Sequence, residues 1–277
     1  IYGTLPNGAG LSSSASLEVL IGVVLRDMYQ FDIPMIDIVQ IAQRVENTYI
    51  GVNCGIMDQF AVGMSKENNA IYLDTSTLEY ELIPLILKDY VIVIGNTTKK
   101  RALADSKYNE RRRECDDGLK VVQTVYPDVK NVCDLTVKQF DNVSEIFTVR
   151  AVKKRVLHAV TENDRTKKAV LALQAKNIDL FAKLINMSHE SLKNDFEVSC
   201  FELDTLVDSF LKNGAIGARM TGAGFGGCIV SIVPEKSVDS LIENVTKEYK
   251  ELTAYNAEFY ICKTSDGARE ITKEEWI

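Results

Sequence analysis

Apolar residues recur at helical spacing in two segments near the start of the chain, and each segment predicts a buried helix face. The first stripe follows a segment rich in glycine and serine, and it consists of Leu17, Leu20, Ile21, Val24, Leu25 and Met28. The second stripe begins after Pro34, and it consists of Ile38, Ala42, Val45 and Tyr49. We therefore expect the glycine- and serine-rich segment to lead directly into the N-terminus of a buried helix.

Short runs of β-branched and aromatic residues between turn residues predict strands later in the chain. The predicted strands cover residues 70–73, 80–84, 90–95, 216–220, 228–233 and 258–262, and the longer helical patterns cover residues 150–176, 178–195, 201–212 and 237–252. The last elements, in the order strand, glycine turn, strand, helix and strand, have the rhythm of a small α+β sandwich. The pattern therefore predicts the α+β class.

The segment at residues 6–16, with the sequence PNGAGLSSSAS, has the composition of a phosphate-binding loop. Gly8 and Gly10 allow the backbone to approach a ligand closely. The amides at the start of the following helix have no acceptor within that helix, and the helix dipole favours an anion there. The segment therefore predicts a phosphate site at a helix N-terminus.

Two better-known phosphate motifs do not fit the sequence. A P-loop of the usual kind ends in Gly-Lys-Ser/Thr, whereas leucine and serines occupy the place of that lysine here. Gly222, Gly224 and Gly227 match the spacing of a dinucleotide fingerprint, but a predicted strand follows them where that motif requires a helix. The sequence thus favours neither a usual P-loop nor a Rossmann fold.

Composition limits the classes of partner. The 277 residues are 46% hydrophobic and 26% charged, and the net charge of −7 disfavours broad binding to nucleic acid or to an anionic membrane. No apolar run is long enough to cross a bilayer, and the six cysteines lack the spacing of a zinc site or a disulfide framework. We therefore expect a cytoplasmic protein. Because a strand end precedes the glycine loop at Ile1, we also expect further residues before it in the natural protein.

Several segments together resemble the galactokinases of the GHMP family, whose name combines galactokinase, homoserine kinase, mevalonate kinase and phosphomevalonate kinase. Residues 6–16 and the turn RMTGAGFGGC at 219–228 are similar to the second and third signatures of the family. The segments similar to galactokinases themselves are GVNCGIMDQF at 51–60, LADSKYNERR at 103–112, MSHESL at 187–192 and VSC at 198–200. Nothing corresponds to the earlier galactokinase signature, rich in Arg, Glu, His and Asp, that grips the sugar. We therefore expect this chain alone to lack part of the sugar site.

The resemblance implies an α+β, two-domain GHMP kinase fold. Residues 1–85 would be the remainder of the N-terminal GHMP domain, and residues 86–277 would form the C-terminal GHMP domain, a ferredoxin-like α/β sandwich with added helices. The implied reaction transfers the γ-phosphoryl group of ATP to the anomeric hydroxyl of galactose, giving galactose 1-phosphate and ADP in the Leloir pathway. The implied ligands are galactose, ATP and Mg²⁺, with no nucleic acid and no membrane, and we expect a monomer.

Two other functions remain open. A kinase for a modified sugar such as N-acetylgalactosamine would differ in the volume of its pocket near the second carbon of the sugar. A non-catalytic galactose and ATP sensor would resemble the galactokinase-like regulators of yeast, which lack the Ser-Ala pair after the loop serines. Because Ala15-Ser16 is present here, the sequence favours an enzyme over a sensor.

The resemblance also implies roles for individual residues. The nucleotide would be bound by Gly8, Ala9, Gly10, Leu11, Ser12, Ser13, Ser14 and Lys100. Ser14 and Glu46 would bind Mg²⁺, since hydroxyl and carboxylate oxygens suit this cation. Asp58 would be the catalytic residue and would accept the proton of the anomeric hydroxyl during transfer. Gly55, Asp58 and Tyr108 would contact the sugar.

Without the resemblance, several of these residues have plainer interpretations. Glu46 would be an ordinary surface carboxylate, Asp58 a helix-cap or turn residue, and Tyr108 a packing residue. The basic cluster at residues 99–101 would be a solvated face at a helix start. The sequence alone leaves both sets of interpretations open.

The glycine-rich turn at residues 221–227 has too little side chain for chemistry of its own. Four glycines in six residues are more than an ordinary hairpin turn needs, so we expect the backbone of this turn to lie close to the site. The histidines, His158 and His189, have no nucleophile beside them in a recognisable catalytic context. We therefore expect no Ser-His-Asp chemistry.

Overall fold

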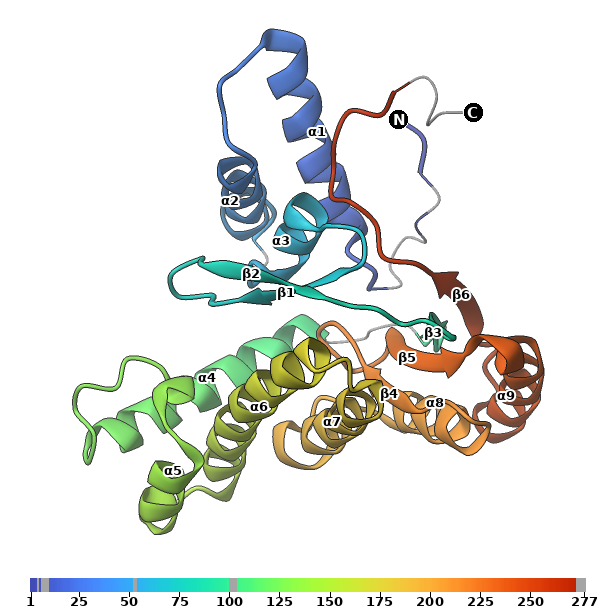
Figure 1. Cartoon of the computed structure of the whole chain (residues 1–277). Coiled ribbons are helices and arrows are strands. Elements are labelled where there is room, and N and C mark those ends of the chain that lie inside the picture. Colours follow the sequence, from blue (N-terminus) through green and yellow to red (C-terminus); the bar gives the residue numbers. More distant parts are fainter. Residues whose placement is uncertain (4, 6–9, 52–53, 100–103, 273–277) are drawn as a thin grey trace. The chain divides into compact units, whose positions relative to one another are not determined.

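The computed structural model describes residues 1–3, 5, 10–51, 54–99 and 104–272, which belong to two compact units (Figure 1). Unit 1 comprises Ile1–Ile86 and Lys263–Ile277, and unit 2 comprises Leu87–Cys262. The sequence suggested a second domain at residues 86–277, which included the C-terminal segment. That segment groups instead with unit 1.

Backbone contacts hold the C-terminal segment against unit 1. Gly267 N donates to Ser65 O and Ala268 N donates to Val62 O, both at 2.8 Å. A Cβ at position 267 would lie 2.5 Å from the carbonyl oxygen of Gly63, so this close approach requires glycine. Such long-range contacts cannot be read from a linear division of the sequence.

The described part of unit 1 consists of helices, a π-helical turn and a β-hairpin. The helices are α1 (Ser13–Tyr29), α2 (Met35–Val45) and α3 (Met57–Met64), the π-helical turn is η1 (Glu46–Ile50), and the strands are β1 (Asn69–Leu73) and β2 (Tyr80–Pro84). The two strands pair in antiparallel fashion, with Asn69 opposite Pro84. Val19 and Val23 of α1 pack with Ile38 and Ala42 of α2. This packing places the start of α1 beside the end of α2.

The buried face of α1 differs from the predicted one. Ala15, Val19 and Val23 are at most 4% exposed. Gly22 allows α2 to approach, since a Cβ there would lie 2.4 Å from Cγ2 of Ile38. The predicted stripe is between 38% and 71% exposed at Leu17, Leu20, Ile21, Val24, Leu25 and Met28. The prediction of a buried stripe is therefore wrong for the described residues, because α1 is apolar on both faces and periodicity alone does not choose between them.

The second predicted stripe is buried at one end only. Ile38 and Ala42 are 4% and 3% exposed, whereas Val45 and Tyr49 are 37% and 86% exposed. Val45 is the last residue of α2, and Tyr49 lies in η1, whose wider turn departs from the spacing of an α-helical stripe. Glu46, the first residue of η1, is buried, with 7% of its surface exposed.

Unit 2 is built on an antiparallel sheet in the order β4-β5-β3-β6. These strands are β4 (Gly217–Met220), β5 (Cys228–Pro234), β3 (Tyr90–Asn96) and β6 (Glu258–Cys262), and α8 (Phe201–Lys212) and α9 (Val238–Thr253) pack against the sheet (Figure 1). The shared core contains Val93, Leu203, Leu206, Phe210, Ile229, Val233, Leu241, Val245 and Tyr249. This sheet with helices confirms the predicted α+β class.

Further helices extend unit 2. They are α4 (Ala104–Gln123), α5 (Val137–Val143), α6 (Arg150–Gln174), α7 (Ile178–Ser191) and the π-helical turn η4 (Leu192–Phe196), with short 3-10 turns at Val132–Asp134, Ser144–Ile146 and Glu235–Ser237. None of the helices in the described part of the chain has both the length and the apolar character needed to cross a membrane. α4 and α6 pack against each other along this extension.

A buried arginine joins the helices of this extension. Arg155 of α6 is 1% exposed. Its Nε donates to Glu114 of α4 at 2.7 Å, and its two terminal nitrogens donate to the Asp195 carbonyl oxygen at 2.6 Å and to Glu197 at 2.8 Å. A buried charge is tolerated when it is paired and hydrogen-bonded in this way. The arginine thus fixes α4 relative to η4.

His158 of α6 makes the stability of unit 2 depend on pH. The ring is 7% exposed, its Nδ1 lies 3.0 Å from Oγ of Ser191, and it stacks on Phe196 at 4.6 Å between ring centroids. Burial lowers the pKa of His158 from 6.5 to about 4. The folded state therefore keeps this ring neutral at pH values at which the unfolded state binds a proton.

We expect His158→Gln to reduce the loss of stability in acid. Because the folded-state pKa is depressed, the contribution of His158 is fully present above about pH 6.5 and is lost as the pH falls towards 4. Between pH 7.5 and pH 4.5 the free energy of unfolding of the wild type should fall by about 2 kcal/mol more than that of the variant. Urea unfolding at both pH values measures this difference, and equal losses would contradict the assignment.

Candidate active site

The N-terminus of α1 is open to an anion. Gly10 and Ser12 have left-handed backbone, with φ of 76° and 58°, so the chain turns sharply before the helix begins at Ser13. The first helical hydrogen bond runs from Ser16 N to Ser12 O at 2.9 Å, and the Ser12 side chain does not cap the helix. The amides of Ser13 and Ser14 therefore lack acceptors within α1 and can donate to a ligand.

The structure describes part of the predicted nucleotide loop. Gly8, Ala9 and Lys100 lie outside the described residues. Leu11, Ser12 and Ser13 are half-buried and Ser14 is exposed, in one continuous turn into α1. The left-handed conformation of Ser12 costs about 1–2 kcal/mol for a residue with a Cβ. Backbone strain of this kind is typical of ligand-binding turns.

Glu46 and Glu18 form a carboxyl pair one helical turn along α1 from Ser14. Glu46 is 7% exposed, so the interpretation of it as an ordinary surface carboxylate is wrong. Burial, together with the nearby charge of Glu46, raises the pKa of Glu18 to about 7. The proximity of two acids is therefore costly unless a proton or a cation compensates it.

The oxygens in this part of unit 1 fit a magnesium ion. Mg²⁺ prefers hard oxygen ligands and keeps waters and phosphate oxygens in its remaining positions. Ser14 offers an exposed hydroxyl, Glu46 a buried carboxylate, and Oε2 of Glu18 is buried without a hydrogen-bond partner in the described structure. Among the described residues, no group of three or more His, Cys, Asp or Glu side chains could hold a metal. A cation here would thus depend on nucleotide phosphates as well.

Asp58 and Gly55 lie at the start of α3. Ile56 is the N-cap, so Asp58 is the second residue of the helix rather than its cap, and its side chain is half-buried. Gly55 is exposed, and no described atom lies within 4 Å of where its Cβ would be. The backbone beside Asp58 is therefore accessible to a ligand.

In unit 2, Tyr108 lies in the second turn of α4 and is half-buried. The neighbouring Lys107 places its ammonium group 5.2 Å from the ring centroid of Phe225, which belongs to the glycine-rich turn. Lys99, from the basic cluster, forms an ion pair with Glu202 at 2.6 Å. A solvated face is therefore the wrong description for Lys99.

The glycine-rich turn joins the antiparallel strands β4 and β5, which confirms that it is no dinucleotide fingerprint. Its left-handed glycines are Gly222, Gly224, Gly226 and Gly227, with φ of 76°, 84°, 129° and 84°. Phe225 N donates to Val198 O at 2.8 Å, and a Cβ on Gly224 would lie 2.1 Å from the same oxygen. The turn thus packs its backbone directly on the backbone of the segment before α8.

Both histidines occur in chains of polar side chains, but the order of each chain differs from that of a catalytic triad. Nδ1 of His189 accepts from Met220 N at 3.2 Å, and its Nε2 lies 3.5 Å from Asp204. Ser199 donates to the same aspartate at 2.5 Å and not to the histidine. His189 therefore supports the end of β4 before the glycine-rich turn.

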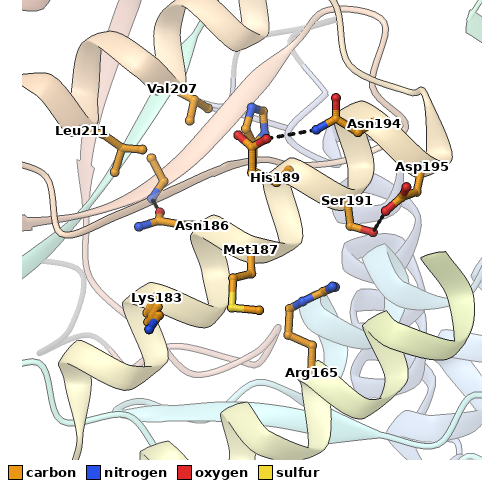
Figure 2. A pocket seen from close by; sticks show the side chains of 12 residues that line it. Arg165, Lys183, Asn186, Met187, His189, Ser191, Asn194, Asp195, Val207 and Leu211 are labelled. Atoms are coloured by element: carbon orange, nitrogen blue, oxygen red, sulfur yellow. Dashed lines mark hydrogen bonds between the residues drawn. The ribbon is translucent and has the colours of Figure 1, made fainter. Parts of the chain in front are cut away.

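A hollow of about 410 Å³ lies over α7 and its neighbouring helices in unit 2 (Figure 2). Arg165, Lys183 and Met187 line it, and the side chain of Asn194 donates to Glu190 at 3.0 Å beside it. None of the described residues that the sequence assigned to nucleotide, metal or sugar line this hollow. We therefore place no part of the predicted chemistry there.

In unit 1, Glu18 lies near Glu46 and follows Ser14 on α1, and the sequence did not single it out. The signal was present, because residues four apart on a helix share a face and Glu18 follows Ser14 by four. Gln59, beside Asp58, lowers the pKa of Glu18 and therefore places part of α3 near the same carboxyl groups. Its participation depends on packing between helices and has no signal in the sequence.

Known proteins resemble the chain along nearly all of its length. The model of the GHMP kinases N terminal domain matches residues 1–66, and the model named GHMP kinases C terminal matches residues 169–251. The galactokinase of Fusobacterium nucleatum subsp. nucleatum is 52% identical over 271 residues, which are 98% of this chain and 70% of that protein. The galactokinase of Clostridium beijerinckii is 53% identical over 271 residues, which are 98% of this chain and 69% of that protein.

A solved structure resembles the fold as well. The crystal structure of Lactococcus lactis galactokinase complexed with galactose superimposes with a TM-score of 0.93 at 46% identity, covering 97% of this chain and 69% of that chain. The predicted resemblance and the predicted GHMP kinase fold are confirmed. By sequence and by structure, the chain belongs to the GHMP kinase family.

Proposed function

We propose that the intact protein catalyses the galactokinase reaction, in which the γ-phosphoryl group of ATP is transferred to the anomeric hydroxyl of galactose, and that this chain supplies most of the residues of the site. The products are ADP and galactose 1-phosphate, and the latter is the first phosphorylated intermediate of galactose metabolism. Phosphoryl transfer depends mainly on positioning and charge neutralisation, so the residues of the site must bind phosphate, hold a cation and receive a proton. Each of these tasks has a candidate among the described residues.

The turn into α1 is our candidate for phosphate binding. Amides from Gly10 to Ser14 would donate to phosphate oxygens, and the dipole of α1 would add a favourable field. Ser14 and Glu46 would hold Mg²⁺, which when bound would neutralise charge on the β- and γ-phosphates. Gly8, Ala9 and Lys100 are proposed for the same nucleotide from the sequence alone.

Asp58 is our candidate for the catalytic base. It lies half-buried in the first turn of α3, beside the accessible backbone of Gly55, and a carboxylate there would accept the proton of a sugar hydroxyl. The exposed backbone at Gly55 and the phenol of Tyr108 are proposed as further sugar contacts. The supporting observation in unit 1 is the open space beside Gly55.

One observation supports the proposal above the others. The helix α1 has an uncapped N-terminus, and its next turn carries the half-buried Glu18 near the buried Glu46, in a chain that is about half identical to galactokinases. This is the combination of anion site and cation site that a kinase for MgATP needs. A cytoplasmic location, a monomeric state and the absence of nucleic-acid and membrane partners stay predictions from the sequence.

The test is sugar-dependent ADP release by the natural full-length protein, with MgATP in excess. We expect release with galactose and only background with N-acetylgalactosamine or without sugar. Release with N-acetylgalactosamine alone would identify a kinase for the modified sugar and overturn the choice of substrate. Galactose binding without ADP release would identify a sensor and overturn the proposed catalysis.

A further inference from the structure

Glu18 occupies an unusual place for an acid. It follows Ser14 by four residues on α1, so the two side chains lie on one face of the helix. Its Oε2 is buried without a hydrogen-bond partner among the described residues. Glu46, at the end of α2, is 7% exposed and lies near enough for its charge to act on the Glu18 carboxyl group. An ordinary surface glutamate would direct both oxygens to water.

Gln59 supplies an independent observation at the same place. Its side chain is 2% exposed, and its Oε1 is buried with no hydrogen-bond partner in the described structure. Its Nε2 donates to Sγ of Cys54 at 3.9 Å, and the amide lies near enough to Glu18 to lower the pKa of that carboxyl group. A third helix, α3, thus adds another unsatisfied acceptor oxygen to the cluster.

Unsatisfied buried acceptors require an explanation, because each costs about 1–3 kcal/mol. A carboxyl pair that shares one proton would bond Glu18 to Glu46 but would leave Oε2 of Glu18 and Oε1 of Gln59 unsatisfied. A divalent cation with its bound waters satisfies several oxygen acceptors at once and removes the repulsion between the acids. The cluster therefore has the donor set of a cation site with an outer shell.

We propose that Glu18 is a third oxygen group of the proposed Mg²⁺ site, facing the cation beside Ser14 and Glu46, and that Gln59 positions it. This inference rests on the proposed function, which supplies the MgATP. It extends that function by assigning the helix after the phosphate loop a second task. The loop end of α1 binds phosphate, and the next turn of the same helix holds the cation that accompanies it.

The test measures metal binding rather than turnover. Mn²⁺ replaces Mg²⁺, and the electron paramagnetic resonance signal of free Mn²⁺ gives its affinity for the natural full-length protein with a non-hydrolysable ATP analogue. We expect Glu18→Gln to weaken Mn²⁺ binding about 10–100-fold, as loss of an outer-shell partner does. Glu81→Gln, at an exposed position on β2 of the same unit, is the matched control and should leave the affinity unchanged.

Two further readouts separate the possible outcomes. Binding of the analogue in excess EDTA should be the same in the wild type and in Glu18→Gln, because the phosphate amides are untouched. Normal Mn²⁺ affinity in Glu18→Gln with weakened affinity in Glu46→Gln would overturn this inference and leave the proposed metal site in place. Absence of nucleotide-dependent Mn²⁺ binding in the wild type would overturn the metal site itself, while sugar-dependent ADP release would still report on the proposed function.

Discussion

Asp58→Asn is expected to lower kcat for galactose phosphorylation by about 10²–10⁴-fold, the usual contribution of a positioned general base. The amide has nearly the shape of the carboxylate but cannot accept the proton of the anomeric hydroxyl. The side chain is half-buried at the second position of α3, so the fold should tolerate the change. Steady-state kinetics with galactose and MgATP measure the effect, and the KM for ATP should change little.

The matched control is Asp37→Asn. Asp37 also lies in the first turn of a helix of unit 1, and it is exposed. Both substitutions remove a favourable charge–dipole interaction of about 0.3–1 kcal/mol, so their effects on stability should be similar. Unchanged kcat in Asp58→Asn, or an equal fall of kcat in both variants, would contradict the assignment of Asp58 as the base.

Gly224→Ala is expected to destabilise the protein by about 3–5 kcal/mol, because overpacking against backbone adds to left-handed strain. The new Cβ would lie 2.1 Å from the carbonyl oxygen of Val198, which the amide of Phe225 already holds at 2.8 Å. A clash with backbone cannot be relieved by rotating a side chain. Chemical denaturation followed by circular dichroism measures the loss.

Gly214→Ala separates the clash from the strain. Gly214 has φ of 106°, but no described atom lies within 4 Å of its Cβ position. Both substitutions lower the entropy of the unfolded chain equally, and both place alanine in left-handed backbone, so Gly214→Ala should cost only about 1–2 kcal/mol. Equal losses in the two variants would show that the turn can move away from Val198.

Elements with one clear pattern could be predicted closely from the sequence. β2, β6 and α8 were predicted with the bounds that the structure shows, since alternation or helical spacing ends there at turn residues. The buried face of α1 could not be predicted, because apolar residues surround the helix and only the small residues at 15, 19 and 22 reveal where α2 approaches. Packing between elements decides such cases.

The same distinction applies to the candidate site. The phosphate turn is local, since glycines, serines and a helix start within eleven residues define it, and the sequence therefore predicted it. The burial of Glu46, where α2 passes into the π-helical turn η1, belongs to the packing of helices against one another, which no local pattern specifies. The contact of Gln59 with Glu18 likewise joins segments about forty residues apart. Contacts between residues that are distant in the sequence follow from the tertiary structure, so no local sequence pattern predicts them.

The most direct test of the central claim is to identify the product. The natural full-length protein would be incubated with galactose and MgATP, and the reaction would be followed by phosphorus nuclear magnetic resonance. The account predicts a new phosphate ester at the anomeric oxygen, formed in equal amount with ADP. Its phosphorus signal should be split by coupling to the proton on carbon 1 of the sugar. A phosphate ester at another hydroxyl, or ADP without a sugar phosphate, would contradict it.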